Sequence, residues 1–396
     1  MSSIKSTRIQ SIDILRGLVM VLMALDHVRD YTNTGYMFVD PTNLQTTTPF
    51  LFFTRWITHF CAPVFVFLAG TSAFLYGSKK SSKKDLAKFL FTRGLWLILI
   101  ELTVVNFSWT FDITLGVHIF QVIWAIGVCM IFLSALIFLN KRILLALGLL
   151  ILFGHNLLDG ITQTGSEPLS LLWYYVHQFN FQVINNGEGM LAIAYPFLPW
   201  LGIMILGYCF GEFYKKDFDA NLRRKWLLKL GIAAIILFVA LRLINVYGNL
   251  TPWESQDSFA YTVISFFNAT KYPPSLIYTL MTLGPALLFL YGIESVKNKF
   301  TDIMVVFGRV PFFYYIIHLY LIHLIGMVGL VILGEDWQEL IMTVDRFKSG
   351  YLFTIGFDLW VSYLVWIVVI ILLYPICNRY MKYKLKNKDK WWLSYL

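Results

Sequence analysis

The chain of 396 residues is 58% hydrophobic and only 14% charged, whereas charged residues make up about a quarter of an average soluble domain. So many apolar residues cannot be hidden in one globular core, which excludes an ordinary soluble protein. The formal net charge of +9 comes from short basic connections between apolar blocks, so it does not indicate a nucleic-acid-binding protein.

The apolar residues form ten blocks of roughly 20 residues, the length at which a helix crosses a bilayer with its backbone groups satisfied internally. In chain order the blocks cover residues 11–30, 51–77, 86–106, 117–139, 142–159, 191–213, 226–246, 275–294, 303–332 and 354–378. The fifth block is short and the ninth is interrupted by Pro311, so the pattern also allows nine or eleven crossings. These blocks predict an all-α, polytopic helical bundle that forms one membrane domain over residues 1–396.

Basic residues in alternate connections predict the orientation of the helices. They are Lys5, Arg8, Lys79, Lys80, Lys83, Lys84, Lys88, Lys141, Arg142, Lys215, Lys216, Arg223, Arg224, Lys225, Lys297, Lys299 and six residues between 379 and 390. Because positive connections stay in the cytoplasm, both termini are expected there and the longer loops at about 160–190, 247–274 and 333–353 outside. All four cysteines fall inside apolar blocks, which predicts neither disulfides nor a thiolate metal site.

The first block carries two ionisable side chains that share a helix face. Arg16 and His27 are eleven residues apart, or three turns, so they would project in nearly the same direction about 16 Å apart along the axis. Asp13 precedes Arg16 by three residues and Asp30 follows His27 by three, so each carboxylate is spaced to pair with its neighbour. Asp26 is adjacent to His27 and points elsewhere. The block also lacks a signal-cleavage site and is expected to remain as the first helix.

Further ionisable groups lie in the later blocks, where they are costly in lipid and therefore candidates for function. In the predicted orientation, Arg93 and Arg309 join Asp13 and Arg16 in the cytoplasmic half. The outer half holds Asp26, His27, Arg55, His59, Glu101, His118, Gln121, His155, Asp159, Arg242 and Asp358. Arginines inside and histidines outside would suit an anionic donor that enters from the cytoplasm and proton transfer nearer the opposite face. The same ionisable residues are explained equally simply without a catalytic role, as members of structural ion pairs or as residues at helix ends near water.

The outer 160–190 loop combines aromatic and polar side chains, among them Trp173, Tyr175 and Glu188. Aromatic rings beside amides and carboxylates suit a sugar, and Trp173 is the candidate contact. An aromatic belt at the membrane surface fits the same residues. His318 and His323 are five residues apart and therefore about 140° apart on a helix, so they cannot share an ion and no metal is expected.

Four segments in order resemble one family. They are RIQSIDILRG at 8–17 with LDHVRD at 25–30, PVFVFLAG at 63–70, YPPSL at 272–276 with TLGP at 282–285, and GRVPFFYY at 308–315 followed by His318. Together they resemble the heparan-α-glucosaminide N-acetyltransferase catalytic-domain family. An arginine and a histidine separated by ten residues on the first helix is also similar to the signature of the wider transmembrane acyltransferase superfamily.

This resemblance implies an acetyl-CoA-dependent N- or O-acetyltransferase that takes its donor at the cytoplasmic side and modifies a sugar or glycan at the outer side. His27 would be the general base, with Asp30 and Asp26 beside it. Arg16, Asp13, Arg93 and Arg309 would form the donor site, since cationic groups hold the phosphates of CoA. His59, Gln121, His318 and Trp173 are expected near the acceptor. The resemblance, the compact loops and the absent signal sequence suggest a bacterial cytoplasmic membrane.

Two other classes of membrane protein fit parts of the pattern. A secondary transporter would also combine about ten helices, charges within the membrane and interruptions such as Pro196, Pro199 and Pro311, but it should contain inverted repeats, which are not evident here. A non-catalytic subunit of an envelope-modifying complex would make His27 dispensable.

Overall fold

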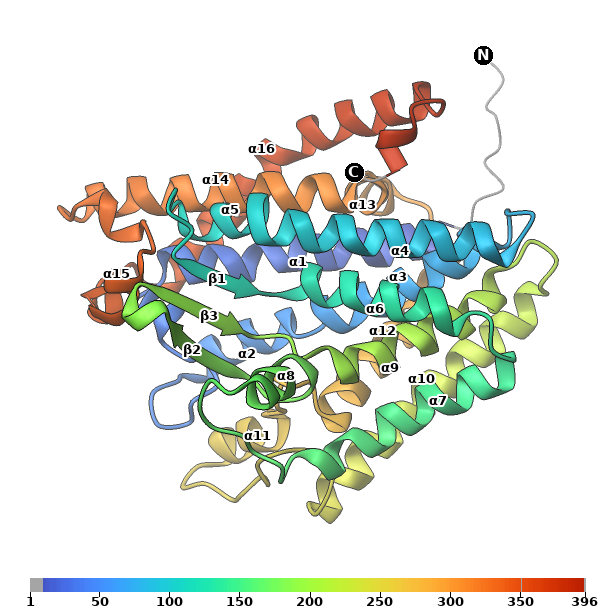
Figure 1. Ribbon diagram of the computed structural model, residues 1–396, viewed down its shortest axis with the longest axis horizontal. Coiled ribbons are helices and arrows are strands. Elements are labelled where there is room, and N and C mark those ends of the chain that lie inside the picture. The colour runs from blue at the N-terminus through green and yellow to red at the C-terminus, as the bar shows by residue number, and fades with distance from the viewer. Residues whose placement is uncertain (1–9, 350, 395–396) are drawn as a thin grey trace.

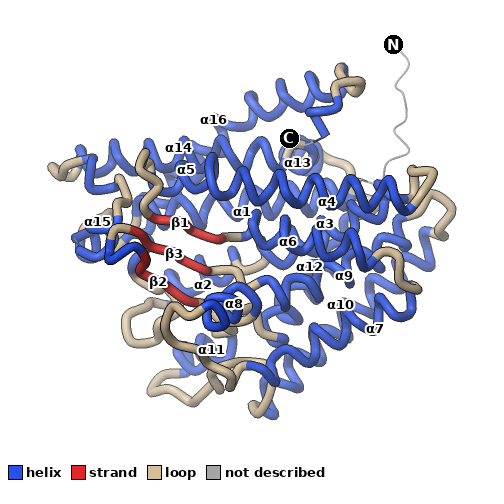
Figure 2. The backbone as a smooth tube through the Cα atoms, in the orientation of Figure 1, coloured by secondary structure: helices blue, strands red, loops and turns tan. Residues whose placement is uncertain are grey.

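The computed structural model describes residues 10–349 and 351–394, so Lys5 and Arg8 of the charge pattern lie outside the described residues. Long helices run side by side between two ends of the molecule (Figure 1). The connections rich in lysine and arginine lie at one end, here called the basic end. A small sheet marks the opposite end, here called the sheet end (Figure 2).

Eight helical segments of the described chain are long and apolar enough to cross a membrane. They are α2 with α3 (Pro49–Thr58 and Cys61–Gly77), α4 to α5 (Lys83–Ile100 and Asn106–Thr110), α7 and its 3-10 extension (Lys141–Gly154 and His155–Leu158), α9 (Phe197–Phe210) continued to Tyr214, α10 (Ala220–Ile244), α12 (Leu276–Ile293), α14 (Pro311–Ile332) and α16 (Leu359–Lys386). The chain is therefore the predicted polytopic helical bundle. The eight segments match eight of the ten predicted blocks.

The other two predicted blocks differ from ordinary spans. The first is α1 (Ser11–Thr32), which carries five charged residues and is nevertheless buried at 18 of its 22 positions. It packs against α2, α3, α12, α13 (Lys299–Arg309), α14 and α16, so it lies in the middle of the bundle, where charges find protein partners. The second is α6 (Val122–Leu136), which is only 15 residues long.

The helix predictions for 117–139 and 191–213 are wrong at their first residues, which are strands. β1 (Val117–Phe120) pairs in parallel with β3 (Gly189–Ile193), and β2 (Asn180–Ile184) pairs antiparallel with β3. The Asn106 side chain donates to the Val117 carbonyl and accepts from the Ile119 amide, so it takes the place of a neighbouring strand at the free edge of β1. Apolar strand residues adjoining apolar helices made each block look continuous.

The predicted outer loops contain secondary structure of their own. They hold α8 (Pro168–Val176) with β2, α11 (Phe259–Phe267), and α15 (Val344–Ser349). Arg242, near the end of α10, donates to the carbonyls of Ser265, Phe266 and Asn268, so it caps the end of α11. A buried arginine that looked functional in the sequence therefore holds one of these segments to the bundle.

Two glycines allow α1 and α13 to approach closely. A Cβ atom at Gly308 would overlap the Asp13 carbonyl oxygen, and one at Gly17 would overlap the Met304 carbonyl oxygen. Both obstacles are backbone atoms, which cannot turn aside as a flexible side chain can. This approach carries Arg16 and Arg309 to opposite sides of Asp13.

Replacing Gly308 by alanine is expected to destabilise the protein, because α1 and α13 must move apart and overpacking costs about 1–3 kcal/mol. The melting temperature in detergent should fall. The matched control is Gly292→Ala in α12, where a Cβ would have nothing within 4 Å and where alanine favours a helix equally. Equal melting temperatures for the two variants would contradict the close approach.

Candidate active site

A cavity of about 380 Å³ lies between α1, α3, α4, α6, α14 and α16. Four cationic side chains line it, namely Arg16, Arg93, Arg309 and Lys384. Apolar side chains from α3, α4 and α6 complete the wall. A site of this kind suits a ligand that combines anionic groups with an apolar arm.

Asp13 joins two of these cations. Its carboxylate lies 3.4 Å from the Arg16 guanidinium and 3.5 Å from that of Arg309. Arg16 also donates to the Gly308 carbonyl at 3.1 Å and to the Ser72 hydroxyl at 2.9 Å. The predicted pairing of Asp13 with Arg16 is therefore present, and Asp13 is best described as holding the arginines in place, since its side chain is fully buried.

A second cavity of about 510 Å³ shares Tyr76, Phe89 and Lys384 with the first, so the two adjoin. Lys388, Lys390 and Trp391 also line it, just beyond the end of α16. In the sequence these lysines indicate only the orientation of the helices, and nothing in their spacing predicts a place near a site. Their clustering beside a tryptophan was the signal that could have identified them, because a basic group next to a flat ring suits a nucleotide.

One face of α1 leads from this cavity toward His27. Arg16 and Met20 both line the cavity, and His27 lies two turns beyond Met20 on the same face. Tyr315 of α14 lines the cavity as well, and its ring centroid is 5.6 Å from that of His318. The ring of His318 is in turn 5.3 Å from that of His27. The cavity and the two histidines are therefore neighbours within one region.

His27 is packed among aromatic rings with a carboxylate beside it. Its ring meets Trp109 edge-on at 4.8 Å, and its Nδ1 lies 3.6 Å from Asp30 Oδ2. This distance is longer than a hydrogen bond, and such contacts often tighten only when a substrate binds. The predicted pairing of His27 with Asp30 is present as a close approach.

His318 has a defined tautomer. Its Nδ1 lies 2.6 Å from the Tyr315 carbonyl oxygen and 3.0 Å from that of Tyr314, and a carbonyl can only accept, so Nδ1 carries the proton. Nε2 then bears the lone pair. His323 instead lies between the carbonyls of Ser108 and Leu340, each 2.9 Å away. The two histidines face different partners, as their spacing predicts.

Asp26 is turned away from His27 and toward cations. It pairs with Arg55 and with Arg29, the latter at 2.9 Å, and accepts a hydrogen bond from Thr58 at 2.9 Å. Arg29 also pairs with Asp30, so one arginine connects the two carboxylates. His59 lies one turn after Arg55 at the break between α2 and α3, with its ring 5.3 Å from that of Tyr278.

Lys271 and Tyr272 belong to this region, although the sequence analysis did not select them as site residues. Lys271 lies close enough to Asp26 and His59 to interact with both electrostatically. The Tyr272 ring packs on Phe179 and Tyr195, with centroids 5.8 and 5.3 Å away. Burial alone raises the pKa of Tyr272, but the nearby Lys271 and Arg55 cations outweigh it and lower this pKa below its ordinary value. Phe179, Lys271 and Tyr272 are half-buried, whereas Tyr195 is buried. Half-buried rings beside a lysine suit a sugar.

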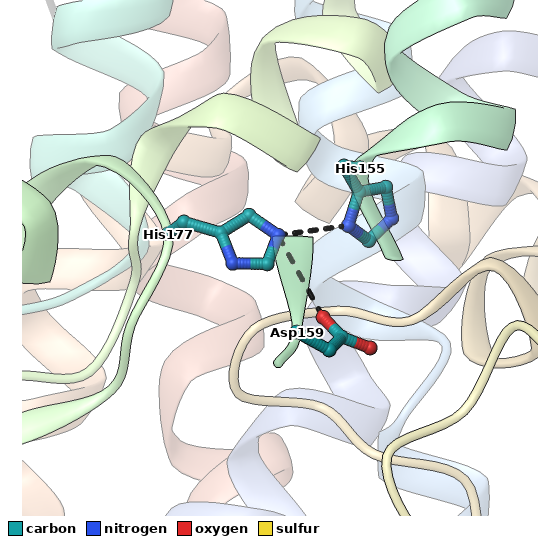
Figure 3. Close-up of side chains that lie close together, drawn as sticks. All are labelled: His155, Asp159 and His177. Carbon is teal, nitrogen blue, oxygen red and sulfur yellow. Dashed lines mark hydrogen bonds and ion pairs between the residues drawn. The ribbon is translucent and has the colours of Figure 1, made fainter. Parts of the chain in front are cut away.

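Two other predicted site residues have different surroundings. The backbone amide of Gln121 donates to Glu101 at 3.1 Å, so this buried carboxylate caps the start of α6. Trp173 donates to the Ile161 carbonyl at 2.8 Å and stacks on His177. Trp173 therefore packs on a second polar cluster, which consists of His155, Asp159 and His177 (Figure 3).

Comparison with known protein families gives one result. The family model described as "Heparan-alpha-glucosaminide N-acetyltransferase, catalytic" matches residues 8–248. The matched part contains Arg16, His27 and Arg93 and ends before Arg309 and His318. The resemblance of the segments at 272–285 and 308–318 to this family stays a prediction from the sequence. A search of curated proteins finds no match.

Proposed function

Because the chain belongs to the heparan-α-glucosaminide N-acetyltransferase catalytic-domain family of membrane acetyltransferases, we propose that it moves an acetyl group from acetyl-CoA to a sugar or glycan. The donor enters from the cytoplasm at the basic end, and the acceptor amine or hydroxyl binds toward the sheet end. Both termini are cytoplasmic, residues 1–396 act as one domain, and the protein resides in a bacterial cytoplasmic membrane.

The cavity at the basic end is the observation that carries this proposal. Arg16, Arg93, Arg309 and Lys384 surround it, and Lys388 and Lys390 line the adjoining cavity. The phosphates of CoA would bind among these cations, and the adenine ring would pack near Trp391. The apolar wall would accept the extended arm of acetyl-CoA. This arm would run along α1 and carry the thioester toward His27.

The chemical step needs a base at the far end of that arm. His27 Nε2 takes the proton of the acceptor amine or hydroxyl. At the same time the nitrogen or oxygen of the acceptor attacks the thioester carbonyl. The carbon–sulfur bond then breaks, and CoA leaves as a thiolate that takes up the proton held by His27, which restores the neutral imidazole. Asp30, 3.6 Å from His27 Nδ1, orients the ring and stabilises its protonated form. Phe179 and Tyr272, which are half-buried, would stack on the acceptor sugar.

A transporter and a non-catalytic subunit are the competing functions. A transporter needs a route for its substrate but no donor, so it gives no reason for a cationic cavity in the same region as His27 and His318. A non-catalytic subunit gives no reason for the shared face of Arg16 and His27. The family membership also favours the enzyme.

A sidedness assay tests the proposal. Purified protein is reconstituted in liposomes, [¹⁴C]acetyl-CoA is enclosed on one side and glucosamine or a muropeptide is supplied on the other. Labelled acceptor should form only when acetyl-CoA faces the basic end, whose orientation is established by labelling a cysteine introduced at Ser81. Transport of unmodified acceptor, or product formation with both substrates on the sheet side, would contradict the proposal.

A further inference from the structure

The second polar cluster lies at the sheet-end terminus of α7. His155 and Asp159 are one turn apart on the 3-10 extension of α7 and just after it, and His177 follows α8. His155 Nδ1 lies 3.3 Å from His177 Nε2, and Asp159 Oδ1 lies 3.7 Å from the same nitrogen. Figure 3 shows the three side chains converging on one point from two segments.

Hydrogen bonding alone leaves this cluster incomplete. His177 Nε2 carries either a proton or a lone pair, so it can serve His155 or Asp159 but not both. Asp159 Oδ1 is buried and has no hydrogen-bond partner among the described residues. Both histidines are buried, and three polar atoms that face one another without full pairing are costly.

The separations match the coordination shell of a metal ion. Around a tetrahedral Zn²⁺ with bonds of about 2.0–2.1 Å, ligand atoms lie about 3.3–3.4 Å apart. One atom from each of the three residues lies within 4.8 Å of the others, so small side-chain movements bring all three to bonding distance. Two imidazoles with one carboxylate form a donor set that suits Zn²⁺.

Residues around the cluster orient its members. Asn156 donates to the second carboxylate oxygen, Asp159 Oδ2, at 2.8 Å, which leaves Oδ1 directed at His177. Trp173 stacks on the His177 ring with centroids 5.5 Å apart. Partners of this kind fix ligand orientation in metal sites.

We propose that His155, Asp159 and His177 bind one Zn²⁺ ion, which fastens α8 and its preceding loop to the end of α7. The site revises the expectation that the protein holds no metal. That expectation rested on the spacing of His318 and His323, whereas His155 and His177 are 22 positions apart in the sequence and meet only in the folded chain. The proposal is independent of the proposed acetyl transfer, because it concerns a different cluster.

Metal analysis of the full chain tests the proposal. The protein is purified in detergent without a polyhistidine tag, stripped with a chelator and dialysed against Zn²⁺. About one equivalent of bound zinc is expected by mass spectrometry of the metal, together with a rise in melting temperature. Competition with a chromophoric chelator then gives the affinity of the wild type and of Asp159→Asn and His177→Gln.

Each variant should bind Zn²⁺ more than about tenfold more weakly, since loss of a residue that only orients a metal ligand already costs about 10–100-fold. The matched control is His118→Gln, a half-buried histidine on β1 that lies outside the cluster, and its affinity should equal that of the wild type. Asp159→Asn keeps the size of the side chain and protects the test from a folding failure. No zinc uptake by the wild type, or a zinc affinity in both variants equal to that of the wild type, would overturn the proposal.

Discussion

Replacing His27 by asparagine is expected to lower the rate of acetyl transfer by about 10²–10⁴-fold, the usual contribution of a positioned general base. Asparagine keeps a polar group of similar reach but cannot accept the acceptor's proton at neutral pH. The cationic cavity lies about two turns away, beginning at Met20, so acetyl-CoA binding should persist. Turnover, acetyl-CoA affinity and melting temperature are measured on the same preparation.

The matched control for this substitution is His118→Asn, because His118 lies on β1 and contacts neither Asp30 nor the cavity in the described part of the chain. Burial lowers the pKa of His118. Because this side chain lies away from the proposed site, its loss should leave the rate unchanged. A stable His27→Asn protein that retains full activity would refute the assignment. His318, whose Nε2 carries a lone pair near His27, would then become the candidate base.

Replacing Arg16 by alanine is expected to raise the KM for acetyl-CoA about 10- to 100-fold, because a hydrogen bond to a charged group contributes about 1.5–3 kcal/mol. The phosphate contact is the same in the ground and transition states, so kcat should change much less. Initial rates at varied acetyl-CoA, with the acceptor in excess, measure both constants.

The substitution also removes a partner of buried Asp13, so stability must be measured alongside. Arg16→Lys is the matched variant, since it keeps the positive charge next to Asp13 but loses the two-pronged geometry toward Gly308 and Ser72. It should retain the melting temperature and show a smaller rise in KM. An unchanged KM in a folded Arg16→Ala protein would remove this residue from the donor site.

The apolar blocks along the chain were sufficient to predict the helical bundle. The spacing of the charged residues was sufficient to predict which side chains pair within α1. Blocks of about 20 apolar residues form helices in lipid, because every backbone group must be hydrogen-bonded within the segment. Helical periodicity likewise places Asp13 beside Arg16 and Asp30 beside His27, which the structure contains at 3.4 and 3.6 Å. These are local relations, and local geometry is set by the spacing of residues.

Contacts between distant segments were decided only by the tertiary structure. The sequence could not place Lys384 beside Arg16, His318 beside His27, or Lys271 near Asp26, because helix order does not determine which helices pack together. It also could not separate the apolar strands from the helices they adjoin, since both are equally hydrophobic. Glu101 and Arg242 had looked as functional as Arg16, yet their partners are the start of α6 and the end of α11. A buried charge signals a partner, and only the packing of the bundle determines whether that partner is a helix end, a carboxylate or a substrate.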